Sequence, residues 1–103
     1  MTKINPQEQW KLLIGGEWIE TAETYPVVNP YTTEIVGHAP EATLSEASDA
    51  MTAAREALDG WKNTSIDQRC YLLGKLADVL EQKTPEWVDL VQAETGSTIN
   101  ITE

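Results

Sequence analysis

Polar and apolar residues alternate in the first part of the chain, and this period of two is typical of β-strands. The runs KLLI and EWIE flank Gly15 and Gly16. Two glycines between such runs favour a type I′ turn, because that turn needs a positive φ at both central positions. The alternation places Trp18 on the opposite face from its two neighbours. We therefore expect a β-hairpin here.

A second pair of strand-like runs follows, YPVV and EIVGH, separated by NPYTT. The step from Asn29 to Pro30 and the threonine pair after it are typical of turns. Pro26 is compatible with the start of its strand but not with the interior of a central strand. Residues 12–40 thus predict two β-hairpins.

From Thr43 the apolar period changes to that of a helix. Thr43 and Glu46 form a plausible capping box, with Ser45 as a rival cap, and Gly60 supplies a stop. One helical face is apolar: Ala47, Ala50, Met51, Ala54 and Leu58.

Two further helices are predicted before residue 96. Ser65 and Gln68 form a capping box for the second. Gly74 inside it indicates either the close approach of another element or a glycine that the helix simply tolerates. Its apolar stripe contains Ile66, Leu72, Leu73, Leu76, Ala77 and Leu80. Thr84 caps the third helix with Pro85 at its first position, and Gly96 is a natural left-handed stop. Residues 43–96 are therefore read as three helices, and residues 97–103 as a truncated tail.

The 103 residues allow at most one domain, and the chain contains no phenylalanine. A chain of this length buries roughly 60–70% of its unfolded surface, so its core is thin. We expect a single partial α+β domain over residues 1–103, which needs another surface to pack on.

The formal net charge is −10, which repels nucleic acid, and no basic stripe is present. A single cysteine fits a reducing, cytoplasmic setting. The N-terminus lacks a secretory pattern and no apolar run is long enough to span a membrane. The expected partner is therefore neither nucleic acid nor membrane.

The side chains that could carry chemistry are few. His38 has no second ligand or nucleophile near it in sequence, and is read as an ordinary strand or loop histidine. Cys70 lies near a helix start and beside Arg69, which is compatible with an activated thiolate, but it is read as a small buried or half-buried side chain. The sequence IGGEW lacks the lysine of a phosphate loop and the glycines of a dinucleotide fingerprint. We expect no catalytic and no coenzyme-binding residue in this chain.

Five motifs occur in a fixed order: IGGEWIE, VVNPYTTEIVGHAPEAT, AAREALDGW, RCYLLGKLADVLE and AETG. Together they resemble the N-terminal segment of the NAD(P)-dependent aldehyde dehydrogenase superfamily, over about residues 12–100. The resemblance implies the N-terminal part of the coenzyme-binding domain of that α/β fold. Thr33 stands where the family usually has glycine. It is either strained at a positive φ, by about 1–2 kcal/mol, or the turn has shifted.

The resemblance implies that the complete enzyme oxidises aldehydes to carboxylic acids with NAD or NADP. The family's nucleotide-binding sheet, catalytic cysteine, general-base glutamate and oxyanion-hole asparagine all come later in the chain. Neither Cys70 nor Glu94 matches these residues. This chain alone is therefore expected to bind no coenzyme and to be inactive.

The resemblance also implies a structural monovalent cation site. Its ligands here would be the backbone carbonyls of Val27 and Val28 and the carboxylate of Glu94, with other ligands from the rest of the enzyme. Hard cations prefer such oxygen ligands.

Three readings stay open. The chain is the N-terminal fragment of an aldehyde dehydrogenase, whose partner is the remainder of the subunit or a homologous subunit. Alternatively, it is a non-catalytic interaction module that pairs with or inhibits a full-length or split enzyme. The third reading is a small independent domain of unrelated function.

Overall fold

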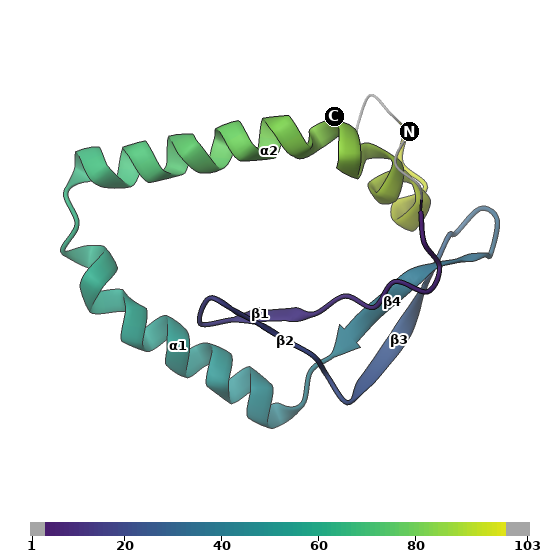
Figure 1. Cartoon of the computed structure of the whole chain (residues 1–103), viewed down its shortest axis with the longest axis horizontal. Coiled ribbons are helices and arrows are strands. Elements are labelled where there is room, and N and C mark those ends of the chain that lie inside the picture. Colours follow the sequence, from purple (N-terminus) through teal and green to yellow (C-terminus); the bar gives the residue numbers. More distant parts are fainter. Residues whose placement is uncertain (1–3, 99–103) are drawn as a thin grey trace.

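The computed structural model describes residues 4–98, which form two β-hairpins followed by two helices (Figure 1). The elements are β1 (Leu12–Ile14), β2 (Glu17–Ile19), β3 (Glu23–Val28), β4 (Ile35–Glu41), α1 (Leu44–Lys62) and α2 (Ile66–Thr95). The predicted α+β class and both hairpins are confirmed. The prediction of three helices is wrong, because the second and third form one continuous helix.

The first hairpin follows from its two glycines. Gly15 and Gly16 have φ values of 59° and 82°, as a type I′ turn requires. Leu13 pairs with Trp18, and these side chains are 59% and 69% exposed on the outer face. On the helix side, a Cβ added to Gly15 would lie 3.7 Å from Cβ of Ala53 in α1. The hairpin therefore lies against α1.

The second hairpin pairs β3 with β4 in antiparallel register. The register shifts between Val27 and Val28, whose partners are Gly37 and Ile35, so Val36 is the extra residue of a β-bulge. Val36 is also 5% exposed, the most buried hydrophobic side chain in the part of the chain that the structure describes. The bulge residue is therefore also the centre of the small hydrophobic core.

Pro26 lies inside β3, opposite His38, and not at the start of its strand as predicted. The main-chain groups of His38 explain why this is tolerated. Its N–H donates to Glu8 O at 2.8 Å and its C=O accepts from Trp10 N at 3.0 Å, on the side away from β3. Pro26 therefore stands opposite a residue that needs no hydrogen bond from it, on an edge strand.

Helix α1 begins at the predicted cap but ends after the predicted stop. Thr43 N donates to Glu46 Oε2 at 2.8 Å and Glu46 N donates to Thr43 Oγ1 at 3.2 Å, so Thr43 is the cap and Ser45 is not. The predicted stop at Gly60 is wrong. The helix continues to Lys62 because Gly60 does not adopt the left-handed conformation that ends a helix.

Helix α2 begins at the predicted cap, where Ser65 Oγ accepts from Gln68 N at 3.1 Å. It then continues through Thr84 and Pro85, which were predicted to start a third helix. Proline removes one helical hydrogen bond, but the Thr84 hydroxyl donates to Leu80 O at 2.9 Å and gives that turn another. Figure 1 shows α2 changing direction towards its C-terminal end. The proline therefore bends the helix without ending it.

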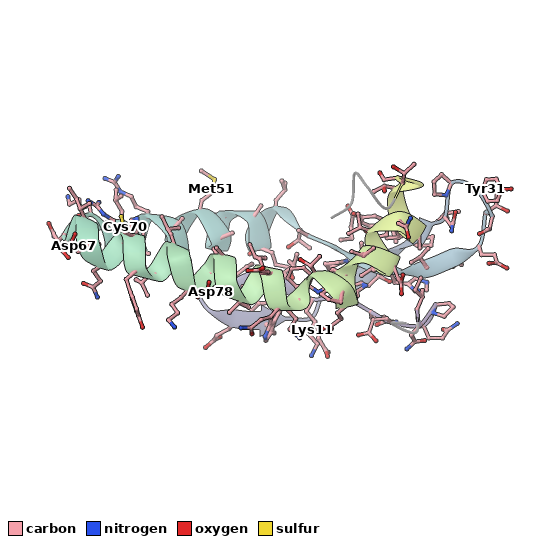
Figure 2. All side chains as sticks on the ribbon, turned by 90° about the horizontal axis from the view of Figure 1, so that it is seen from above. Lys11, Tyr31, Met51, Asp67, Cys70 and Asp78 are labelled. Carbon is pink, nitrogen blue, oxygen red and sulfur yellow. The ribbon has the colours of Figure 1, made fainter. Side chains whose placement is uncertain are left out.

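The chain forms a thin, open layer. Its extents are 48 × 34 × 18 Å, and its radius of gyration is 16.9 Å, where a compact domain of this length has about 13 Å. Figure 2 shows the flattened molecule from its edge, with Met51 projecting from one side. Within residues 4–98, no helix is long and apolar enough to cross a membrane.

Candidate functional site

The turn between β3 and β4 is held by the side chain of Asn29. Its Oδ1 accepts from Tyr31 N at 2.9 Å and from Thr32 N at 3.2 Å. The backbone closes the same turn, because Asn29 O accepts from Thr33 N at 2.9 Å. Thr33 has a φ of 64°, so the turn has not shifted and this β-branched residue is strained.

The end of α2 lies against this turn. Gly96 adopts a φ of 72° and its N–H donates to Gln92 O at 2.8 Å, which confirms the predicted C-cap. A Cβ added to Gly96 would lie 3.2 Å from Cγ of Pro30. The Asn-Pro turn and the Glu-Thr-Gly end, far apart in sequence, are therefore neighbours in space.

The expected cation ligands lie close to this junction. Val27 and Glu94 line one open hollow of about 560 Å³ between the sheet and α2. Val28 does not line it, and follows Val27 across the register shift. The rest of the lining is Trp10, Tyr25, Ala39, Trp87, Leu90 and Val91. Val27 and Glu94 thus share a mostly apolar hollow, and their role as cation ligands stays a prediction.

The available donors suit a hard cation held partly by the main chain. Two backbone carbonyls and one carboxylate offer oxygen ligands, although six or more are needed for an ion such as Ca²⁺. Within residues 4–98, no group of three or more histidine, cysteine, aspartate or glutamate side chains could hold a metal by itself. Three oxygen donors are too few for such an ion, so the site at Val27, Val28 and Glu94 stays a prediction that needs ligands from other residues.

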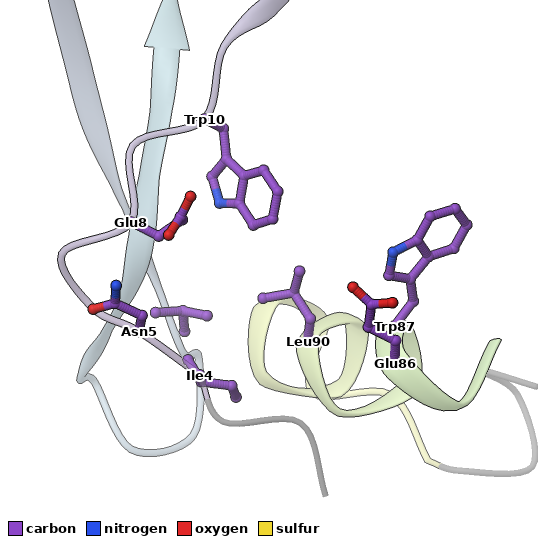
Figure 3. Close-up of a pocket in the computed structure, with 8 residues that line it drawn as sticks. Ile4, Asn5, Glu8, Trp10, Glu86, Trp87 and Leu90 are labelled. Atoms are coloured by element: carbon purple, nitrogen blue, oxygen red, sulfur yellow. The ribbon is translucent and has the colours of Figure 1, made fainter. Parts of the chain in front are cut away.

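A second hollow, of about 180 Å³, lies where the N-terminal segment crosses α2 (Figure 3). Trp10 comes from the segment that bonds to β4, and Trp87 and Leu90 come from α2. Figure 3 shows the indole ring of Trp10 above Leu90 and that of Trp87 to its right. Sequence reasoning missed this site, because nothing in the local pattern predicted that residues 8–10 pair with β4.

The two residues considered for acid–base or nucleophilic chemistry lie apart. His38 lies in β4, and its Nδ1 is buried with no hydrogen-bond partner among the described residues. Cys70 lies on α2 and is exposed, so its prediction as a buried or half-buried side chain is wrong. The hollow beside Cys70 is lined by Tyr71, Gly74, Lys75 and Asp78. The structure thus does not bring the histidine and the thiol together.

The model of the aldehyde dehydrogenase family matches residues 18–103 of this chain. The chain is 38% identical over 101 residues to a malonate-semialdehyde dehydrogenase of Bacillus pumilus, which covers 96% of this chain and 21% of that protein. It is 35% identical over 89 residues to a salicylaldehyde dehydrogenase of Pseudomonas putida, covering 84% of this chain and 18% of that protein. The chain thus spans about a fifth of the length of these relatives.

The solved structures that resemble this chain are also dehydrogenases. A 1-pyrroline-5-carboxylate dehydrogenase of Thermus thermophilus superposes with a TM-score of 0.88 and 31% identity, over 93% of this chain and 19% of that one. The salicylaldehyde dehydrogenase of Pseudomonas putida G7 gives a TM-score of 0.87 and 32% identity, over 93% of this chain and 20% of that one. The chain belongs to the aldehyde dehydrogenase family.

Proposed function

We propose that this chain is the N-terminal part of an enzyme that oxidises aldehydes to carboxylic acids with NAD or NADP. The observation that carries the proposal is the match of residues 18–103 to the family, over only about a fifth of each relative. A solved Thermus relative contains bound NAD, which supports a nicotinamide coenzyme for the complete enzyme. The exposed, free thiol of Cys70 suits a reducing compartment such as the cytoplasm.

Within that enzyme, the role of these residues is structural. The hairpins and helices extend the coenzyme-binding domain, and the nucleophile and coenzyme site belong to later residues. Val27, Val28 and Glu94 supply part of a monovalent cation site at the junction of β3 and α2. Such an ion would fix the sheet to the helix end and would take no part in bond making.

The chain alone is inactive under this proposal. The test is an assay of the pure chain for aldehyde-dependent formation of NADH or NADPH, together with a coenzyme-binding titration. We expect neither turnover nor saturable binding. Robust turnover or micromolar coenzyme binding would overturn the proposal of an inactive N-terminal part.

A second candidate is a non-catalytic module that pairs with, or inhibits, a full-length or split aldehyde dehydrogenase. The exposed apolar side chains of both helices favour it, because they lack a covering layer within the described chain. Mixing the chain with an active family member tests this candidate, since an inhibitory module would lower activity in proportion to its concentration.

A further inference from the structure

A continuous apolar stripe runs along the first half of α2. Its members recur at helical spacing and are each between 43% and 57% exposed. They are Leu72, Leu73, Leu76, Val79 and Leu80. By contrast, the residues of α2 that line the two hollows against the sheet all lie later, within residues 86–94. The stripe therefore belongs to the part of α2 that projects beyond the sheet.

The thickness of the chain explains why the stripe is exposed. The shortest extent is 18 Å, whereas one helix with its side chains is already about 10–12 Å across. A stable domain buries its apolar faces between two packed layers. The described residues supply one layer, so the stripe lacks the layer that would cover it. Exposed apolar patches of this kind mark contact surfaces.

The comparisons indicate which polypeptide would cover the stripe on α2. The chain superposes with TM-scores of 0.87 and 0.88 on segments that form only 19–20% of complete dehydrogenases. Its conformation is therefore that of a segment lying within a much larger protein. A second copy of this chain is a poorer occupant, because two copies with a net charge of −10 repel each other.

We propose that the stripe on α2 docks onto the remaining part of an aldehyde dehydrogenase subunit when that part is supplied as a separate polypeptide, and that docking completes the folding of this chain. The inference rests on the proposed function and names its partner and its contact surface. Coupled folding and binding of this kind lowers affinity, since ordering the chain opposes association.

The test uses the Bacillus pumilus malonate-semialdehyde dehydrogenase without the segment that matches this chain. The shortened enzyme and the full 103-residue chain are expressed separately, mixed and analysed by size exclusion. The segment removed from the enzyme, added back in the same way, is the positive control. We expect a one-to-one complex, with a single cooperative melt that neither polypeptide shows alone.

Two variants locate the contact. Leu76→Asp places a charge within the stripe, and Gln82→Asp places the same charge on the polar face of α2. Both side chains are exposed, so the two free variants should have the same helical circular dichroism. We expect Leu76→Asp to weaken the complex by at least about tenfold and Gln82→Asp to leave it unchanged.

Elution of the chain alone, or only with itself, would overturn the proposal, as would equal binding of the two variants. Dehydrogenase activity is a separate measurement. A complex without activity would leave the docking surface standing and would count against the proposed contribution to aldehyde oxidation. Activity in the complex would support both.

Discussion

Gly96, which ends α2, lies directly against Pro30 of the turn between β3 and β4. A Cβ at Gly96 would lie 3.2 Å from Pro30 Cγ, and the residue has a φ of 72°. Two constraints therefore require glycine here, the left-handed conformation and the close approach of the proline ring. This contact brings the turn after β3 against the end of α2, and Val27 and Glu94 of the same two elements line one hollow.

Gly96→Ala should loosen this junction. The left-handed conformation costs an alanine about 1–2 kcal/mol, and the added methyl must displace Pro30. Urea titration of the helical signal should show the loss. Gly60→Ala is the matched control, because nothing lies within 4 Å of its added Cβ and its backbone is helical. That variant should gain up to about 1 kcal/mol, and equal effects would contradict the argument.

Thr33→Gly should stabilise the second hairpin. Thr33 holds a φ of 64°, and glycine removes a strain of about 1 kcal/mol there, although the hydroxyl bond to Thr32 O at 2.6 Å is lost. Amide hydrogen exchange in β3 and β4 should slow. Thr32→Gly should have the opposite effect, because Thr32 Oγ1 accepts from Glu34 N at 3.3 Å. Faster exchange in Thr33→Gly would show that the strain is not stored at this residue.

Gly74→Ala reports whether another element approaches α2. Nothing lies within 4 Å of the added Cβ, so the free chain should gain up to about 1 kcal/mol of helix stability. If a partner packs closely at Gly74, the same variant should weaken the complex. The comparison needs circular dichroism of the free chain and an affinity measurement with the shortened enzyme. If the variant raises both the helix stability of the free chain and its affinity for the shortened enzyme, no partner packs closely at Gly74.

The cation site should respond only when the missing ligands are present. Val27, Val28 and Glu94 supply too few oxygens to hold an ion alone, so the melt of the free chain should not depend on Na⁺ or K⁺. In the complex, replacing these ions by choline should lower the melting temperature. Glu94→Gln should remove that dependence, whereas Glu81→Gln on the same helix should keep it. An unchanged dependence in Glu94→Gln would exclude the carboxylate as a ligand.

Local chemistry made much of the fold predictable. The hairpin glycines, the caps Thr43 and Ser65 and the stop at Gly96 all act through hydrogen bonds or φ values set within a few residues. Pro85 misled the prediction because a threonine and a proline can start a helix or bend one. In the structure the helix continues through both residues, and the Thr84 hydroxyl donates to Leu80 O.

The candidate site was less accessible to sequence reasoning. The prediction of cation ligands rested on the family resemblance, and the structure shows only that Val27 and Glu94 line the same hollow. The pairing of Glu8 and Trp10 with His38 has no local signature, because it depends on where the preceding chain returns to β4. Likewise, the prediction for Cys70 assumed that another element covers it, whereas its side chain is exposed among the described residues.

The free chain should melt with low cooperativity. Val36 is the most buried hydrophobic side chain among residues 4–98, and it is accompanied by exposed tryptophans, leucines and tyrosines. Two-state unfolding needs a core that is lost as a unit, and a complete domain of about 100 residues unfolds with an enthalpy near 60–80 kcal/mol. Calorimetry should show a broad transition of much smaller enthalpy, despite a helical circular dichroism spectrum. A sharp melt of full enthalpy would mean that the chain has a closed core of its own, and would remove the reason for it to seek a second layer.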